Sequence, residues 1–324
     1  MPIYPLRRDT YISDLSALLE PDTASRLGIQ AVLRLDAHTS LRWPAELQVL
    51  HLPGGTPHHL SAEELHQAVA FIAQHHTVGH TVLIQDENTN HRAAGVWLGY
   101  LIAQQGYTLP VAFLWSILRY PYLNPSPDVL RTLAHAYDLP YHEAQLRSQS
   151  FFEHLVHTAQ DGINTVLPGL HISSAGARNQ QADVRARGVQ AVLRLDSNRT
   201  PDPDWGAEFT VLHLPFADQH LIPAGFLRQA TAFIHTHATA ERGVLVHCQM
   251  GISRSSTILL AYLIEYGGYS LPDAWGLLSA ARPFAYPHSM PLASLITEYG
   301  LAYPLYTLES PFFLDDLLGE RTRL

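Results

Sequence analysis

The hydrophobic and polar residues of this chain follow two different periods. Short apolar runs at residues 191–195 (AVLRL), 210–214 (TVLHL) and 243–246 (GVLV) are typical of buried β-strands. Longer runs at residues 227–239 and 255–266 (SSTILLAYLIEY) carry apolar side chains at helical spacing. Strands that alternate with helices predict an α/β fold, in which helices cover a central sheet.

The chain also repeats itself at a domain-sized interval. Four segments of the first half recur in the same order in the second half: 28–36 (GIQAVLRLD) as 188–196 (GVQAVLRLD), 49–53 as 211–215 (both VLHLP), 70–75 (AFIAQH) as 232–237 (AFIHTH), and 106–110 (GYTLP) as 268–272 (GYSLP). The offset is 160 residues for the first pair (188 − 28) and 162 for the others (211 − 49, for example). Such an interval far exceeds a solenoid repeat, so the sequence indicates one fold duplicated.

The repeat gives expected domain limits. Residues 1–140 form the first domain and residues 163–310 the second. The amphipathic stretch 141–162 predicts a helical linker, and residues 311–324 form a C-terminal tail without a counterpart in the first half. A length of 324 residues suits two domains of about 150 residues each.

The composition limits the classes of protein to which this chain can belong. Apolar residues make up 47% of the chain and charged residues 15%, which excludes a disordered chain. The net charge is −9, and all 20 basic residues are arginines, so we expect no nucleic-acid partner and no membrane partner. Cys248 is the single cysteine, which excludes an intrachain disulfide. The first residues lack a signal-type apolar core, and the apolar run 93–103 is too short to span a bilayer, so a soluble cytoplasmic protein is expected.

Residues 244–257 (VLVHCQMGISRSST) combine a strand, a tight loop and the start of a helix around Cys248. Such a loop can turn successive backbone N–H groups inward to form an anion-binding nest, and the helix N-terminus adds partial positive charge. Gly251 supplies the backbone freedom, and the planar fork of Arg254 can bind two phosphate oxygens. The same field favours the thiolate form of Cys248, so the spacing predicts a nucleophile directed at phosphorus.

The pattern HC-x5-R-S at residues 247–255 is the signature of cysteine-dependent protein phosphatases. Residues 167–178 (LPGLHISSAGAR) and 281–300 (ARPFAYPHSMPLASLITEYG) resemble the first strand and the closing segment of the dual-specificity phosphatase family. The resemblance covers most of each half. It implies two tandem phosphotyrosine-phosphatase-like domains, each a central sheet flanked by helices, and hydrolysis of phosphomonoesters without a metal or other cofactor. In this family, an Asn often follows the Pro of the closing segment and supports the phosphate loop. Here His288 follows Pro287, so the sequence lacks this asparagine support.

The resemblance also implies residue roles. Asp218, 30 residues before Cys248, stands where the family has the acid that protonates the leaving oxygen and later helps to activate water. Ser255 assists departure of the thiolate, and His247 orients Cys248. The loop residues that contribute mainly backbone amides to the phosphate are Gln249, Met250, Gly251, Ile252 and Ser253, followed by Arg254.

The offset of 162 residues predicts that the first half has lost this chemistry. Asp86 stands at the position of Cys248, Thr89 at that of Gly251 and Ala93 at that of Ser255, while Arg92 matches Arg254. Thr56 stands at the position of the acid Asp218. We therefore interpret the first half as a pseudophosphatase whose degenerate site is occupied by Asp86 paired with Arg92.

The expected substrate is phosphotyrosine in a phosphorylated protein, extending to phosphoserine and phosphothreonine. Two alternatives remain open: a non-catalytic phosphate-binding scaffold, and a phosphatase of a non-protein substrate such as a phosphoinositide or an RNA 5′-phosphate. The 20 histidines do not show the spacing of a metal site, so no metal ligands are assigned. An intramolecular contact between the two domains is also expected.

Overall fold

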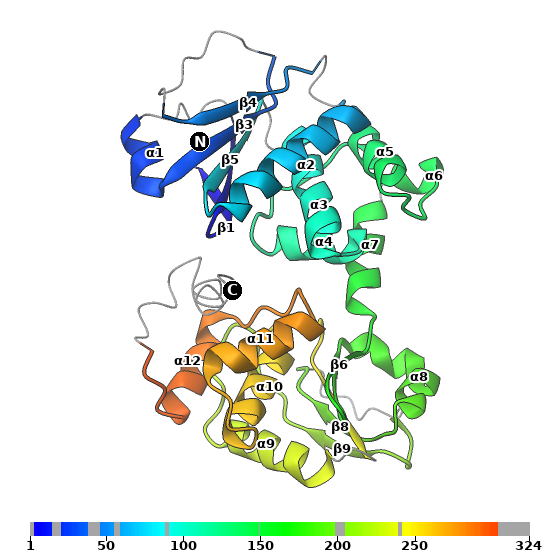
Figure 1. Ribbon diagram of the computed structural model, residues 1–324. Helices are drawn as coiled ribbons and strands as arrows, with labels where there is room; N and C mark the ends of the chain where they lie inside the picture. The colour runs from blue at the N-terminus through cyan, green and yellow to red at the C-terminus, as the bar shows by residue number, and fades with distance from the viewer. Residues whose placement is uncertain are drawn as a thin grey trace. The chain divides into compact units, whose positions relative to one another are not determined.

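The computed structural model of the chain shows two compact units, Met1–Val156 and His157–Leu324 (Figure 1). The structure describes residues 3–14, 21–37, 46–54, 59–87, 91–148, 150–197, 205–238 and 242–303. The division falls within helix α7 (Phe151–Gln160). The expected domain limits at residues 140 and 163 stay predictions, and the expected tail 311–324 lies outside the described residues.

The second unit is built on a five-stranded sheet with the order β6-β7-β10-β8-β9. Its strands are β6 (Asn164–Leu167), β7 (Leu170–Ser173), β8 (Val189–Arg194), β9 (Thr210–His213) and β10 (Gly243–His247). β10 lies in the middle and runs parallel to β7 and β8, while β6 pairs antiparallel with β7. The three strands predicted from apolar runs are confirmed as β8, β9 and β10.

The helices of the second unit follow the predicted pattern. They are the 3₁₀ helix η1 (Ala175–Gln180), α8 (Gln181–Ala186), α9 (Phe226–His237), α10 (Arg254–Glu265), α11 (Leu271–Ala281) and α12 (Ser289–Glu298). α9 and α10 confirm the two helices expected at residues 227–239 and 255–266. Ser270 caps α11 by accepting a hydrogen bond from the backbone N–H of Asp273 (3.2 Å).

Both faces of the sheet are covered at β8 and β10, which explains why these two strands are almost continuously apolar. Ile172, Leu193 and Val246 belong to one buried cluster, and the alternating positions Val192 and Leu245 belong to another. Side chains alternate between the two faces of a strand, so a strand buried on both faces shows no polar alternation.

The first unit has a sheet of the same strand order, β1-β2-β5-β3-β4. Its strands are β1 (Tyr4–Arg7), β2 (Thr10–Asp14), β3 (Ile29–Arg34), β4 (Gln48–His51) and β5 (Thr81–Asp86). Its helices are α1 (Pro21–Leu27), α2 (Ala62–Thr77), α3 (Arg92–Gln105), α4 (Leu109–Ile117) and α5 (Pro127–Ala136). β5 takes the place of β10 and α3 that of α10, so the repeat seen in the sequence is matched by repeated topology.

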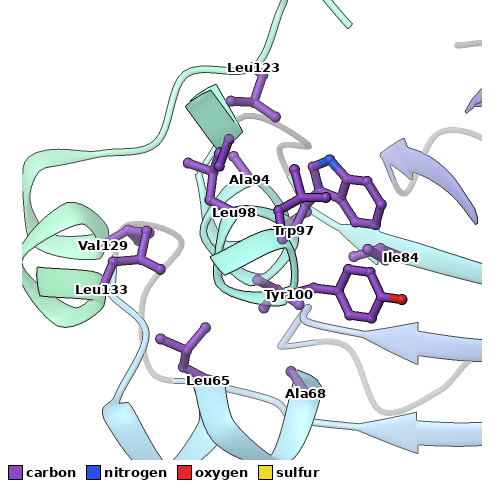
Figure 2. Packing of buried hydrophobic residues seen from close by; sticks show 14 of the residues in the cluster. Leu65, Ala68, Ile84, Ala94, Trp97, Leu98, Tyr100, Leu123, Val129 and Leu133 are labelled. Carbon is purple, nitrogen blue, oxygen red and sulfur yellow. The ribbon is translucent and has the colours of Figure 1, made fainter. Parts of the chain in front are cut away.

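The core of the first unit is centred on α3. Figure 2 shows Trp97 and Tyr100 of this helix on the side of Ile84 in β5, and their rings stack with centroids 5.3 Å apart. Leu98, on the opposite side, lies near Val129 of α5. Burial of a side chain of this size contributes about 2 kcal/mol, so these contacts fix the N-terminus of α3 at the end of β5.

The expected linker 141–162 contains two helices, α6 (Glu143–Leu146) and α7, instead of one. Ser148 lies between them, and its hydroxyl is 2.9 Å from that of Ser150. Serine favours such local hydrogen bonds over a continuous helix, which accounts for the interruption. Within the described residues, no helix is long and apolar enough to cross a membrane.

Candidate active site

The candidate site lies at the carboxyl end of β10, where residues 248–253 join the strand to α10. In sheets of this type, ligands bind beyond the carboxyl ends of the parallel strands. The N-terminus of α10 also presents backbone N–H groups that lack partners within the helix, which suits an anion.

Cys248 lies inside this loop and is 2% exposed. Its Sγ accepts a hydrogen bond from the backbone N–H of Gly251 (3.2 Å) and lies 3.4 Å from the Oγ of Ser255. Gly251 has φ +67°, and a Cβ atom there would lie only 2.5 Å from the carbonyl oxygen of Ser173. Glycine is therefore required at the position whose N–H faces the sulfur.

Arg254, the first residue of α10, is buried with one side of its guanidinium fixed. Its NH1 group donates to the carbonyl oxygens of Phe216 (3.0 Å) and Leu195 (3.2 Å) and to the hydroxyl of Ser197 (3.3 Å). Its Nε is buried, has no hydrogen-bond partner among the described residues, and lies 3.7 Å from Oδ1 of Asp218. The guanidinium is thus held in place through NH1, and its Nε faces the carboxylate of Asp218.

Asp218 lies on the segment between β9 and α9, and its side chain is 43% exposed. Its Oδ1 accepts a hydrogen bond from the backbone N–H of Gln219 (3.1 Å), which has φ +59°. Further along this segment, the N–H of Ile222 donates to the hydroxyl of Ser294 in α12 (2.9 Å). The structure therefore places the carboxylate of Asp218 beside Arg254, and its role as the acid stays a prediction.

His247 lies behind the nucleophile. It is fully buried, and its Nδ1 lies 3.3 Å from the carbonyl oxygen of Cys248 and 3.9 Å from a carboxylate oxygen of Asp196. Burial lowers the pKa of His247 to about 4, against the opposing effect of Asp196, so the ring is neutral at physiological pH. The contact is with the backbone of Cys248, and the expected orienting role of His247 stays a prediction.

The closing segment supports the loop through its backbone. The N–H of His288 donates to the hydroxyl of Ser253 (3.1 Å), and the N–H of Tyr286 donates to the carbonyl of Ile252 (2.9 Å). The ring of His288 instead accepts a hydrogen bond from the N–H of Met290 (3.4 Å) and caps α12. The loop is therefore supported at this position without the asparagine that the family often has.

Sequence reasoning missed Arg282, which is fully buried beneath the loop. Its Nε donates to the carbonyl oxygen of Gly251 (2.7 Å). The sequence did carry a signal, because Arg282 stands among apolar neighbours (AARPF) in the closing segment, and a buried arginine requires several acceptors.

The corresponding site of the first unit is filled by its own carboxylate. Asp86, at the end of β5, accepts hydrogen bonds through Oδ2 from the backbone N–H groups of Arg92 and Ala93 (both 3.1 Å). Its Oδ1 accepts from the N–H of Glu87 (2.8 Å). Asp86 thus occupies the N-terminus of α3, where an anion would bind. Thr56 and Thr89 lie outside the described residues.

The Arg92 guanidinium does not pair with Asp86, which was the expected partner. The guanidinium forms an ion pair with Glu64 of α2 (3.2 Å) and donates to the carbonyl oxygens of Leu35 and Leu52. The expected pairing with Asp86 is made through the backbone N–H of Arg92 instead. The reason is that α2 places the carboxylate of Glu64 beside the Arg92 guanidinium. In the second unit, Phe226 stands at the position that matches Glu64.

No group of three or more His, Cys, Asp or Glu side chains that could hold a metal ion occurs in the described part of the chain. The reactive groups gathered at residues 248–255 are instead a thiol, a hydroxyl and a guanidinium, and the carboxylate of Asp218 lies beside the guanidinium. Such a set of groups can supply a nucleophile and an acid beside an anion-binding loop.

Comparison with known proteins agrees with this geometry. The family description "Dual specificity phosphatase, catalytic domain" matches residues 173–300. Dual specificity protein phosphatase 22-B of Danio rerio is 31% identical over 132 residues, covering 40% of this chain and 69% of that protein. Dual specificity protein phosphatase 8 of Mus musculus is 31% identical over 159 residues, covering 48% of this chain and 23% of that protein.

The chain spans only 23% and 22% of the length of the mouse and human forms of phosphatase 8. The crystal structure of DUSP15 aligns with 50% of this chain and 97% of its own, at 26% identity and a TM-score of 0.40. The match of residues 173–300 and the coverage of the Danio rerio relative establish that the chain belongs to the dual specificity protein phosphatase family.

Proposed function

We propose that the second unit hydrolyses phosphomonoesters through a cysteinyl-phosphate intermediate. The observation that carries this proposal is the arrangement at Cys248, whose sulfur accepts the Gly251 N–H and lies 3.4 Å from the Ser255 hydroxyl. Arg254 and Asp218 lie together beside the same loop. A thiol in an anion-binding loop with an adjacent acid is suited to phosphoryl transfer.

In the first step, the Cys248 thiolate attacks phosphorus while the bond from phosphorus to the ester oxygen breaks. Asp218 gives its proton to that oxygen, and the alcohol or phenol leaves. Arg254 and the loop N–H groups bind the equatorial phosphoryl oxygens, where charge is spread in the transition state.

In the second step, water attacks the phosphocysteine and gives a proton to the Asp218 carboxylate. The S–P bond breaks, and inorganic phosphate and the Cys248 thiolate are released. The hydroxyl of Ser255 can donate a hydrogen bond to the departing sulfur. This restores both the thiolate and the protonated acid.

The names of the related proteins support a phosphorylated protein as substrate, with phosphotyrosine and then phosphoserine and phosphothreonine as the phospho-residues. The side chains around the loop predict a preference for apolar residues beside the phosphorylated residue. Three apolar side chains are exposed there: Leu221 on the segment that carries Asp218, Met250 in the loop and Met290 in α12. The three short segments that carry them, residues 218–222, 249–253 and 286–290, contain no lysine and no arginine.

We therefore expect faster hydrolysis of phosphotyrosyl peptides with Leu or Met beside the phosphotyrosine than of peptides with Asp or Glu there. The expected ratio of kcat/KM is about tenfold, equivalent to roughly 1.4 kcal/mol of apolar burial. Leu221→Gln should reduce this ratio without reducing hydrolysis of a small aryl phosphate. Faster turnover of the acidic peptides by the wild type would contradict the preference.

The proposed function is tested by hydrolysis of a small aryl phosphate by the full chain in EDTA, with acid quenching to trap phosphate on Cys248. Turnover with labelled Cys248 supports the proposal. Binding of tungstate without turnover would favour the non-catalytic scaffold. Selective turnover of a phosphoinositide or of an RNA 5′-phosphate over phosphopeptides would assign a non-protein substrate.

For the first unit, we propose a pseudophosphatase that binds no phosphate. Support comes from the repeated strand order and from Asp86, which fills the N-terminus of α3. Glu64 further neutralises Arg92. A phosphate dianion would have to displace a carboxylate that already accepts three backbone N–H groups. Soaking with tungstate should therefore place an anion at Cys248 and none at Asp86.

The buried carboxyl group of Asp86 is expected to make the free energy of unfolding depend on pH. Burial raises the pKa of Asp86 to about 7, although the N–H groups of Ala93, Arg92 and Glu87 and the charge of Arg92 act to lower it. The folded chain therefore holds this proton more tightly than the unfolded chain. The free energy of unfolding is expected to fall as pH rises from about 4 to about 7, by on the order of 4 kcal/mol at most.

Hydrogen exchange of the β5 amides at pH 5 and pH 8, corrected for intrinsic rates, measures this slope. Asp86→Asn should remove most of it, because the amide does not ionise. His75 and His76, whose pKa values are lowered by burial, titrate in both proteins and cancel in the comparison. An equal slope in wild type and variant would show that Asp86 is ionised throughout.

A further inference from the structure

We propose that Arg282 is a positioning residue that turns two peptide groups of the phosphate loop so that their N–H groups face the nucleophile. The proposal rests on the proposed function, because it assigns how the loop acquires its anion-binding form. It concerns a residue that makes no direct contact with the reacting atoms.

Arg282 is fully buried and joins two parts of the second unit. Its acceptors in the loop are the carbonyl oxygens of Gly251 (2.7 Å from Nε) and Met250 (3.4 Å from NH2). Its acceptors at the junction of α7 and β6 are the carbonyl oxygens of Gln160 (3.1 Å) and Gly162 (3.0 Å) and Oδ1 of Asn164 (2.5 Å). The guanidinium thus fastens the loop to a segment about 90 residues before it in sequence (251 − 162 = 89).

The geometry of the peptide group links these contacts to Cys248. The Met250 carbonyl and the Gly251 N–H belong to one peptide, and no peptide bond in the described chain is cis. In a planar trans peptide the C=O and N–H point in opposite directions. The carbonyl is held by Arg282 while the N–H donates to the sulfur of Cys248 (3.2 Å).

The same argument applies to the next peptide. The Gly251 carbonyl accepts from Nε of Arg282, so the N–H of Ile252 points away from Arg282. Two successive N–H groups are therefore directed away from the buried guanidinium, as an anion-binding nest requires. This orientation depends on Gly251, whose φ is +67°.

Arg282 also places a positive charge close to the nucleophile. Burial lowers the pKa of Arg282 to about 9, and the charge of Cys248 acts to raise it, so the guanidinium is a cation at neutral pH. A buried cation beside the loop favours the thiolate and the bound phosphate alike.

The first unit supplies an internal comparison. At the offset of 162 residues, Tyr120 stands at the position of Arg282, and it is buried. A tyrosine has a single O–H donor and no charge, so it cannot hold two loop carbonyls and a second segment together. The arginine is present in the copy that has the cysteine and the loop glycine, and absent from the copy that lacks both.

The test compares Arg282→Gln and Arg282→Lys with wild type in the full chain. Because Cys248 is the only cysteine, alkylation by iodoacetate reports on its thiolate without further substitutions. Arg282→Gln should lower kcat for an aryl phosphate about 100-fold, the loss typical of a small misplacement of reacting groups. The acidic limb of its alkylation rate should also move to higher pH.

Arg282→Lys should keep the alkylation profile close to that of wild type but retain most of the loss in kcat. Lysine keeps the charge, yet it cannot reach both loop carbonyls and the α7–β6 junction with one ammonium group. Asn164→Ala, a milder change that removes one acceptor of Arg282, should give a smaller loss in kcat with a folded protein.

Arg228→Gln is the matched control. Arg228 and Arg282 both lie 4.3 Å above an aromatic ring, that of Tyr299 and that of Phe284 respectively, but Arg228 lies on α9 and is half exposed. This variant should keep the kcat and the alkylation profile of wild type. Hydrogen exchange of β10 and α10 measures whether each variant is folded.

Wild-type kcat and alkylation in folded Arg282→Gln would overturn the proposal. It would also be overturned if the activity lost in Arg282→Gln and Asn164→Ala equalled the unfolded fraction, because Arg282 would then only stabilise the fold. If wild type itself shows no turnover, the proposed function fails, but the alkylation profiles of the same variants still decide the role of Arg282.

Discussion

Replacement of Cys248 by serine is expected to abolish hydrolysis of an aryl phosphate, with a loss of kcat on the order of 10⁴–10⁶. The chain has no second thiol, and the serine hydroxyl is not ionised at neutral pH, so the loop would hold the phosphate without a competent nucleophile. Phosphate release in EDTA by the two proteins at equal concentration measures the loss.

Two further measurements test whether Cys248 itself attacks phosphorus. Cys248→Ser should still bind tungstate, because the loop N–H groups and Arg254 remain. Acid-quenched wild type should carry one phosphate on the peptide that contains Cys248, and the variant should carry none. Substantial turnover by the variant would show that another group attacks phosphorus and would refute the proposed intermediate.

Much of the fold could be predicted because the relevant signals are local. β8 and β10 are buried on both faces, so they stand out as short apolar runs, and β9 follows β8 as a third apolar run at the edge of the sheet. The duplication could be detected because both copies preserve these runs, and each copy then adopts the same strand order. Cys248, Arg254 and Ser255 lie within eight residues of one another, so a strand, loop and helix are sufficient to bring them together.

The features that the sequence did not reveal depend on contacts between distant segments. The acceptors of Arg282 include Gln160 and Asn164, and nothing in local spacing connects residues that far apart. Glu64 reaches Arg92 because α2 packs beside α3, which hydrophobic periodicity does not specify. The support of the loop at His288 was not predicted, because only an asparagine side chain was considered for it. The donor is instead the backbone N–H of His288, a group that every residue except proline has.

Asp218→Asn is expected to lower kcat by about 10²–10⁴ for phosphotyrosine or phenyl phosphate, whose leaving oxygens need a proton. The loss should be much smaller for nitrophenyl phosphate, because its phenolate leaves readily without protonation. Wild type should show a bell-shaped dependence of kcat/KM on pH, because the proposed mechanism needs an ionised nucleophile and a protonated acid at the same time. The variant should lose the alkaline limb and keep the acidic one.

The leaving-group series separates acid catalysis from positioning. The Asp218 carboxylate lies 3.7 Å from Nε of Arg254, so its removal could also disturb the guanidinium. A disturbed guanidinium would weaken binding of the phosphoryl group in every substrate, and the loss would then be equal for phenyl and nitrophenyl phosphate. Asp183→Asn is the control, because that side chain is 48% exposed and lies 3.2 Å from Arg187 in an ion pair on α8. If Asp218→Asn loses the same factor in kcat for both substrates and retains the alkaline limb, Asp218 is a positioning residue and not the acid. Another group must then protonate the leaving oxygen.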